Sequence, residues 1–347
     1  MKKGGGTLKV RLKDIAKAAG VSPTTVSLVL NNRPVRVSDN TRKNILKLSK
    51  ELNYIPNQQA RSLAKNQTNM IGLIVPNIEN PFFASIATSI ESLLTEYNYI
   101  TIIMNSNDSH HSEKKMLEKM TALNVDGLII VYSNEFFFTH SVDYIQKKKR
   151  AIPTILLDRY IEDVESPQVY YNNELSGYIT TKFLISIGHQ NIGMLGANET
   201  LINSRHRYKG YKKALKEHNI AINEDWYVET AITFEDGYNK ADQILRHGEV
   251  TSVICGNDLS ALGFMRRAEE IGCRIPDDIS VVGHDNIELN RYSSKPLTSI
   301  EQNPRKLAEY AVNKLINQIE HKSTNHSFYS DIILEPNLVI GKTTKRL

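Results

Sequence analysis

Three hydroxyl side chains with helical spacing are the most informative group of residues in this chain. Thr24, Thr25 and Ser27 lie on the polar side of a short predicted helix. Ser22 can accept hydrogen bonds from the free amide groups of its first turn, and Pro23 suits the first helical position. Hydroxyl groups can contact either type of base, and a threonine methyl group can pack on thymine. This small polar face is typical of a helix that enters the DNA major groove.

Two further predicted helices would hold this helix in place. The preceding helix carries apolar residues on one face, and Gly20 then permits a sharp turn, as in a helix-turn-helix. A third helix begins at Ser38 and ends before Pro56, because proline cannot continue it. The apolar residues expected to face this small core are Ile15, Ala18, Ala19, Val26, Val29, Leu30, Ile45, Leu48 and Leu52.

Charge divides the chain at about residue 68. Residues 1–68 contain 14 Lys or Arg against three Asp or Glu, whereas the remaining residues contain 29 against 35. A basic region followed by a mildly acidic one is typical of a nucleic-acid-binding domain joined to a second domain. Together with the helix-turn-helix pattern, the charge predicts DNA as the partner of the N-terminal region.

Composition and motifs argue against several other classes of protein. No apolar run approaches the ~20 residues of a membrane span, and the N-terminus lacks the apolar stretch of a signal peptide. Cys255 and Cys273 give neither a disulfide framework nor metal-ligand spacing, so we expect a reducing cytoplasm, no metal and no cofactor. Hydrolase and metalloprotease motifs are absent, and His110-His111 is predicted to lie in a solvated loop. An enzyme is not expected.

From Ile71 onward, short apolar runs alternate with amphipathic helical patterns. The runs expected to form strands are 71–75, 100–104, 127–132, 154–157, 191–195, 252–255 and 280–283. The helical patterns cover residues 85–97, 113–123, 175–187, 205–217, 236–246 and 259–271. Continuous apolar strands that alternate with helices predict parallel sheets covered on both faces, and this many units favour two lobes. Ligands of such sheets bind at the carboxyl ends of the strands.

The chain resembles the LacI/GalR family of transcription regulators over about residues 12–344. The motifs that carry the resemblance, in family order and spacing, are 14–22 (DIAKAAGVS), 25–27 (TVS), 52–57 (LNYIPN), 60–63 (ARSL), 125–129 (VDGLI), 187–189 (IGH), 256–258 (GND), 278–285 (DISVVGHD) and 296–300 (PLTSI). The resemblance implies an α/β fold in which a small all-α helix-turn-helix domain precedes a two-lobed, periplasmic-binding-protein-like body with two parallel sheets.

The resemblance also implies where the domains begin and end. The helix-turn-helix domain would cover residues 8–56, a hinge helix and linker residues 57–68, and the effector-binding and dimerisation domain residues 69–347. Within the body, the N-lobe would comprise about 69–170 and 299–330. The C-lobe would comprise about 171–298 and 331–347.

In the family pattern the second helix is the recognition helix, and the hinge helix pairs across a homodimer and enters the minor groove. The residues expected to contact DNA are Pro23, Thr24, Thr25, Ser27, Leu28, Asn31, Asn57, Ala60 and Leu63. Leu63 would wedge into a central base step. Several relatives carry Arg or His at the position of Leu28, so the operator's outer bases are not predicted. The candidate phosphate contacts are Lys13, Lys17, Arg42, Lys43 and Lys47.

For the body, the resemblance implies a small sugar effector between the lobes. The expected ligand contacts are Phe82, Phe83, Asp158, Arg159, Arg207, Asn257 and Asp285. Carboxylate and amide groups suit hydroxyl pairs, arginine offers a planar fork, and an aromatic ring can stack on a sugar face. Relatives that bind purine carry different residues around Leu201 and Arg159, which favours a sugar. His284 stands where relatives often have an aromatic residue and is a candidate specificity residue.

The sequence therefore predicts a cytoplasmic, homodimeric repressor of carbohydrate-utilisation genes. A sugar would control its affinity for a pseudo-palindromic operator in double-stranded DNA. Two alternatives stay open, namely control by a phosphorylated partner protein, as in the family's carbon-catabolite regulators, and a sugar-binding receptor without a regulatory role. Induction and corepression use the same architecture, so the sign of the response, the effector and the operator sequence are left open.

Overall fold

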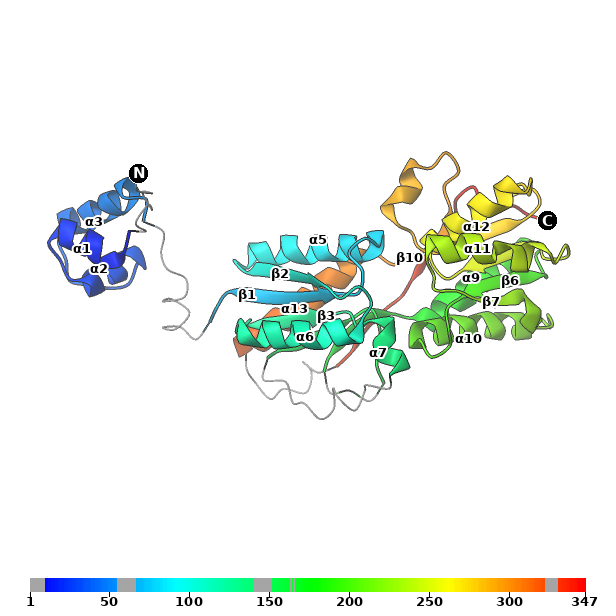
Figure 1. Cartoon of the computed structure of the whole chain (residues 1–347), viewed down its shortest axis with the longest axis horizontal. Helices are drawn as coiled ribbons and strands as arrows, with labels where there is room; N and C mark the ends of the chain where they lie inside the picture. The colour runs from blue at the N-terminus through cyan, green and yellow to red at the C-terminus, as the bar shows by residue number, and fades with distance from the viewer. Residues whose placement is uncertain (1–9, 55–66, 140–151, 163, 165, 322–329) are drawn as a thin grey trace, which may run out of the picture. The chain divides into compact units, whose positions relative to one another are not determined.

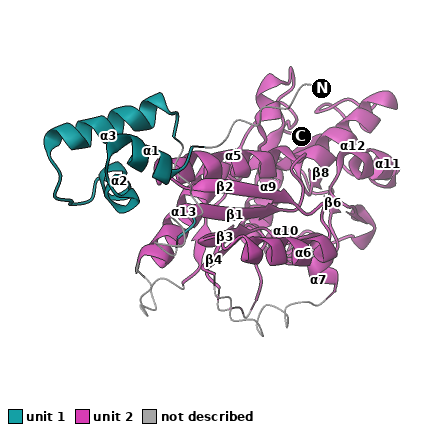
Figure 2. Ribbon diagram, turned by 60° about the vertical axis from the view of Figure 1, so that its left-hand side comes forward, with its two compact units in different colours: residues 1–68 teal, residues 69–347 magenta. Residues whose placement is uncertain are grey.

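The computed structural model describes residues 10–54, 67–139, 152–162, 164, 166–321 and 330–347 (Figure 1). The chain divides into two compact units, residues 1–68 and residues 69–347 (Figure 2). Each unit has its own apolar core.

In residues 10–54, the described part of the first unit holds the helices α1 (Leu12–Ala19), α2 (Pro23–Leu30) and α3 (Asp39–Glu51). Gly20 ends α1 with a φ of 67°, a left-handed conformation that glycine adopts without strain. The predicted helix starts are confirmed, because Ser22 Oγ accepts from Thr25 N at 3.1 Å and Ser38 Oγ accepts from Thr41 N at 3.2 Å. Local capping hydrogen bonds thus set the beginning of both helices.

The core of this unit is built from Ile15, Ala16, Val26, Val29 and Ile45. The prediction of Ala18 as a core residue is wrong, because Ala18 is exposed. The apolar stripe of α1 starts at Leu12 and continues through residues 15, 16 and 19, which turns Ala18 outward. Leu52 is also more exposed than expected, at 37%.

The second unit contains two six-stranded sheets. The first has the order β11-β5-β4-β3-β1-β2, and the second has the order β12-β10-β9-β8-β6-β7. The strands of the first sheet are β1 (Met70–Val75), β2 (Ile100–Asn105), β3 (Gly127–Ile130), β4 (Thr154–Leu157), β5 (Gln168–Tyr171) and β11 (Ile332–Leu334). Those of the second are β6 (Ile192–Gly196), β7 (Tyr227–Glu229), β8 (Ser252–Cys255), β9 (Ser280–Asp285), β10 (Thr298–Glu301) and β12 (Asn337–Val339). Pairing is parallel throughout except between β10 and β12.

Helices cover both faces of each sheet, as the continuous apolar strands predict. Those in the described residues of the first lobe are α5 (Pro81–Glu96), α6 (His110–Ala122), α7 (Asn134–Phe138) and α13 (Pro304–His321). Those of the second lobe are α9 (Asn173–Ser186), α10 (Ile202–Glu217), α11 (Phe234–Leu245) and α12 (Asp258–Glu270). Two 3-10 turns, Glu224–Trp226 and Glu288–Tyr292, complete the second lobe. The core of the first lobe lies between its sheet and α5 and α13 on one face, and between the sheet and α6 and α7 on the other.

The predicted lobe boundaries near 298 and 330 are wrong by a few residues. Thr298 pairs with Val282 of β9, so β10 belongs to the second sheet rather than to the N-lobe. Ile332 pairs with Val169 of β5, so β11 belongs to the first sheet rather than to the C-lobe. These short strands carry too few apolar residues to show in the sequence pattern, and only their pairing partners assign them.

Several helices begin three or four residues earlier than the apolar pattern indicates. Helix α5 starts at Pro81 behind an Asn80 cap, whose side chain accepts from Phe82 N at 3.0 Å. Helix α6 starts at His110 behind Ser109. The first turn of each helix is held by its cap rather than by apolar periodicity, which explains the late predicted starts.

Candidate functional site

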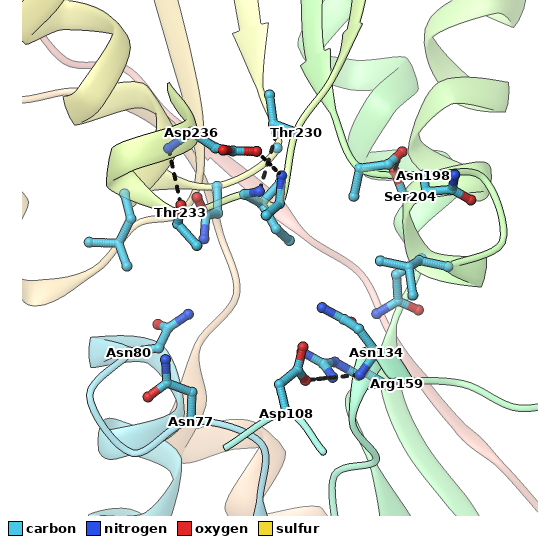
Figure 3. Close-up of a pocket in the computed structure, with 18 of the residues that line it drawn as sticks. Asn77, Asn80, Asp108, Asn134, Arg159, Asn198, Ser204, Thr230, Thr233 and Asp236 are labelled. Carbon is cyan, nitrogen blue, oxygen red and sulfur yellow. Dashed lines mark hydrogen bonds and ion pairs between the residues drawn. The ribbon is translucent and has the colours of Figure 1, made fainter. Parts of the chain in front are cut away.

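The carboxyl ends of the strands meet at one cavity of about 650 Å³ (Figure 3). In each sheet the second strand lies on one side of the first strand and the third strand lies on its other side, so the strand order reverses at β1 and at β6. Such a switch point leaves a crevice in which ligands can bind. Figure 3 shows polar side chains of the two lobes facing one another across the open centre of this cavity. All seven residues expected to contact an effector line it, namely Phe82, Phe83, Asp158, Arg159, Arg207, Asn257 and Asp285.

Two carboxylates hold unusual backbone conformations at this edge. Asp158 follows β4 with a φ of 64°, and Asp285 ends β9 with a φ of 98°. Non-glycine residues adopt such angles where the surroundings over-determine them, and these positions cluster at binding sites. Burial raises the pKa of Asp158 to about 6 and the pKa of Asp285 to about 7, while the charge of Arg207 opposes both shifts. Both side chains can accept hydrogen bonds from a bound hydroxyl.

Arg207 brings a partly buried cation to the same place from α10. Its Nη1 donates to the backbone carbonyl oxygen of Gly256, and its Nε is a buried donor without a hydrogen-bond partner among the described residues. Desolvation lowers the pKa of the Arg207 guanidinium, and the charges of Asp285 and Asp158 act against this shift. A buried donor without a partner is costly, so a ligand oxygen at this position would stabilise the site.

Arg159 is held by the protein itself. Its Nη1 lies 2.9 Å from Asp108 Oδ1 and 2.6 Å from the carbonyl oxygen of Tyr132. Its guanidinium carbon lies 5.5 Å from the centroid of the Phe83 ring, within the range of a cation–π contact. Arg159 therefore fixes the wall around Phe83 as well as lining the cavity.

Asn257 starts α12, since its Oδ1 accepts from Ser260 N at 2.9 Å. Asp258 is the first residue of α12, and Asn257 is its cap. The buried Asp258 carboxylate accepts from Ile287 N, Asn290 Nδ2 and Ser299 Oγ at 2.8, 2.9 and 2.6 Å. Burial, followed by the charge of Asp285, raises the pKa of Asp258 to about 8. Asp258 fastens α12 to the loop after β9 and does not line the cavity.

His284 and His110 are both buried. His284 lies outside the cavity lining, and its Nδ1 lies 3.0 Å from Asp285 Oδ1, so it contacts a carboxylate of the cavity. His110 is not in a solvated loop but is the buried first residue of α6. Its ring packs 5.2 Å from that of Phe136, and its Nδ1 lies 3.1 Å from Glu113 Oε2. Packing against α7 excludes water from His110, whereas His111 is exposed as expected.

Further lining residues were not identified from the sequence. They include Asn77, Asn80, Asp108, Asn134, Asn198 and Asp236. Asn77 follows β1, Asp108 follows β2 and Asn134 follows β3, so each satisfies the rule that ligands bind beyond the carboxyl ends of parallel strands. Applying that rule to every strand, rather than only to the positions of the family motif, would have found these three residues.

In the first unit, α2 carries the residues expected to face DNA. Pro23 and Thr24 are exposed, and Thr25, Ser27 and Leu28 are partly buried. Leu28 is not a member of the apolar core of this unit. Asn31 Nδ2 donates to the carbonyl oxygen of Ser27 at 2.7 Å. Four of the five candidate phosphate contacts are exposed and Arg42 is partly buried, whereas Asn57, Ala60 and Leu63 lie outside the described residues.

Comparison with known proteins matches both units. Residues 11–57 match the family described as bacterial regulatory proteins, lacI family, and residues 181–344 match a periplasmic binding protein-like domain. The chain is 36% identical to proteins named HTH-type transcriptional repressor PurR from Histophilus somni strain 129Pt and Haemophilus influenzae strain PittEE, over 97% of this chain and 99% of each relative.

Solved structures give the same picture. A Lac repressor dimer bound to operator and the anti-inducer ONPF has a TM-score of 0.85 at 28% identity, covering 97% of this chain and all of that one. A LacI family regulator from Enterococcus faecium with bound ribose has a TM-score of 0.71 at 29% identity, covering 80% of this chain and 99% of that one. Within the described ranges, no helix is long and apolar enough to cross a membrane. No group of three or more His, Cys, Asp or Glu side chains that could hold a metal ion occurs in the same residues.

Proposed function

The chain belongs to the lacI family of bacterial regulatory proteins, and we propose that it is a homodimeric repressor whose operator affinity is controlled by a small sugar. It would act on double-stranded DNA in the cytoplasm, and the cavity of the second unit would receive the effector. The genes it regulates would then serve the use of that carbohydrate.

One observation carries the choice of a sugar, namely the chemistry gathered in the cavity. Its lining combines the acceptors Asp158 and Asp285, the donor Arg207 and the aromatic rings of Phe82 and Phe83. Carboxylates and a guanidinium suit the paired hydroxyl groups of a sugar, and aromatic rings suit its apolar face. The Enterococcus faecium relative with bound ribose supports the same class of ligand.

For DNA, we propose that two copies of α2 read the half-sites of a pseudo-palindromic operator. Thr24, Thr25 and Ser27 would contact base edges, and the basic side chains of α1 and α3 would contact phosphates. Effector binding would then change operator affinity by favouring one of two states of the body. Such coupling is typically about 1–3 kcal/mol, or roughly 5–150-fold in affinity.

The test uses the full-length protein in two steps. A binding sequence is first selected from a library of random DNA duplexes, and a thermal-shift panel then screens sugars, sugar phosphates and purine bases for a ligand. A ligand at a hundred times its Kd adds about 2.7 kcal/mol of stability, which is readily seen. The selected duplex is finally titrated with and without the hit, and we expect its affinity to change about 5–150-fold.

Asp285→Asn is the decisive variant, and Asp277→Asn is its matched control. Asp277 is also a carboxylate of the second lobe, but it pairs with Lys345 at 3.3 Å away from the cavity lining. We expect Asp285→Asn to bind the operator as the unaltered protein does and to lose the response to the sugar, whereas Asp277→Asn keeps it. A purine hit would replace the sugar part of the proposal. No hit across the panel would favour a protein co-regulator.

A further inference from the structure

The cavity has an inner and an outer part, which differ in burial. The inner part is formed by the buried or nearly buried residues Phe82, Phe83, Asp158, Asn257 and Asp285. We define the outer rim as Asn134 and Phe138 of α7 together with Asn198 and Glu229 of the second lobe. Glu229 is exposed, and Phe138 is 48% exposed. The outer rim is not part of the set implied by the family pattern.

The polar half of the outer rim is held in place by hydrogen bonds. Asn198 Nδ2 donates to Glu229 Oε1 at 3.0 Å, and Asn198 Oδ1 accepts from Thr200 N at 2.8 Å. Lys240 Nζ donates to the carbonyl oxygen of Glu229 at 2.8 Å. The rim therefore presents a preorganised amide–carboxylate pair, which is a suitable partner for adjacent hydroxyl groups.

The first lobe contributes an aromatic group to the same rim. Helix α7 is only one turn long, but its start is fixed because Ser133 Oγ accepts from Phe136 N at 3.2 Å and Asp108 Oδ1 accepts from Asn134 N at 2.9 Å. Phe138 at its end lines the cavity. An exposed aromatic ring at the edge of a cavity can pack on the apolar face of a sugar ring.

The size of the cavity exceeds what one sugar ring needs. A volume of about 650 Å³ lies within the range of roughly 300–1,000 Å³ of pockets that receive drug-sized ligands, so the cavity has room for a second ring beside the first. The inner part alone offers enough polar groups for one ring.

The charge of the lining selects against anionic ligands. Its carboxylates are Asp108, Glu135, Asp158, Glu229, Asp236 and Asp285, and its cations are Arg159, Arg207 and Lys240. Arg159 is paired with Asp108 at 2.9 Å, and Lys240 is paired with Asp236 at 3.0 Å. A phosphate group would therefore meet an excess of negative charge in a partly buried site.

From these observations we propose that the effector is a neutral disaccharide. One ring would occupy the inner part, and the second would stack on Phe138 and hydrogen-bond to Asn198 and Glu229 at the outer rim. This inference rests on the proposed control by a sugar and specifies which sugars the site takes.

Isothermal titration of the full-length protein tests the proposal with matched probes. The probes are glucose, galactose, cellobiose, maltose, lactose and glucose 6-phosphate. We expect one disaccharide to bind at least about tenfold more tightly than either component monosaccharide, which corresponds to about 1.4 kcal/mol, and glucose 6-phosphate to bind more weakly than glucose.

Variants then assign the gain to the outer rim. Phe138→Ala should weaken the disaccharide roughly three- to tenfold and leave the monosaccharide within about twofold, whereas Phe138→Tyr should restore the disaccharide affinity. Tyr292→Ala is the control, since Tyr292 is an exposed aromatic residue outside the cavity lining. Equal affinity for mono- and disaccharides, or tighter binding of the phosphate, would overturn this inference while leaving sugar control intact. Binding of none of these sugars would overturn it together with the sugar effector.

Discussion

Arg159 Nη1 lies 2.9 Å from Asp108 Oδ1 and donates from the same nitrogen to the carbonyl oxygen of Tyr132. Asp108 follows β2, Tyr132 follows β3 and Arg159 follows β4, so one guanidinium joins the loops after three strands of the first sheet. Because these loops form the first lobe's wall of the cavity, the position of Phe83 and Asn134 depends on this contact.

Replacing Arg159 with methionine should destabilise the second unit. Hydrogen bonds to charged groups contribute about 1.5–3 kcal/mol, and we expect a loss of that size in urea unfolding, together with weaker effector binding. Arg205→Met is the matched control, since Arg205 pairs with Glu162 at 3.5 Å and its side chain is 45% exposed. An exposed ion pair is worth about 0–1 kcal/mol. Equal losses in both variants would contradict the positioning role of Arg159.

Because buried carboxyl groups of the second unit have raised pKa values, we expect the free energy of unfolding to fall as pH rises to neutrality. Burial raises the pKa of Glu113 to about 7 from its usual 4.5, against the hydrogen bonds that Ser133 donates. Between about pH 4.5 and 7 the folded protein retains a proton that the unfolded chain has released, so the free energy of unfolding decreases with pH. The pKa values of Asp158, Asp258 and Asp285 shift in the same direction.

Glu113→Gln isolates one of these groups, because glutamine keeps an acceptor for Ser133 N and cannot ionise. We expect the decline between pH 5 and pH 8 to shrink by up to about 3 kcal/mol in urea unfolding. Glu118→Gln changes an exposed residue of the same helix and should leave the decline in unfolding free energy unaltered. Parallel pH profiles for the unaltered protein and Glu113→Gln would refute the assignment.

Two single changes in the first unit should separate base contact from phosphate contact. Thr24→Ala should lower affinity for the selected operator by about 1 kcal/mol and leave random DNA unaffected, because Thr24 is exposed on α2. Lys43→Ala should weaken both complexes alike and reduce the salt slope by about one. Fluorescence anisotropy at several salt concentrations measures both effects, and identical behaviour of the two variants would reject the division of roles.

Leu63 remains a prediction from the sequence, since it lies outside the described residues. Leu63→Ala should weaken specific operator binding far more than binding to random DNA, because an apolar wedge helps to kink only a bound operator. Band-shift titrations on both duplexes measure this difference. An equal loss of affinity for both duplexes would contradict the proposed insertion of Leu63 between bases.

The sequence alone determined what depends on local interactions. The starts of α2 and α3 could be predicted because Ser22 and Ser38 cap their own helices, within three residues of the amides they accept from. Strands β4 and β8 could be placed to the residue, because a strand buried on both faces must be continuously apolar. The seven expected ligand contacts came from the family pattern, and all of them line one cavity.

Only the tertiary structure decided what depends on segments that are far apart in the chain. Whether a polar side chain is exposed or buried depends on the element that packs against it. His110 is buried because Phe136 of α7 packs on its ring. Asp258 is a structural anchor because Ser299, 41 residues away, donates to it, although its neighbour Asn257 lines the cavity. Short strands such as β10 and β11 take their place from the strand beside them, since three or four residues carry too little apolar area to fix it alone.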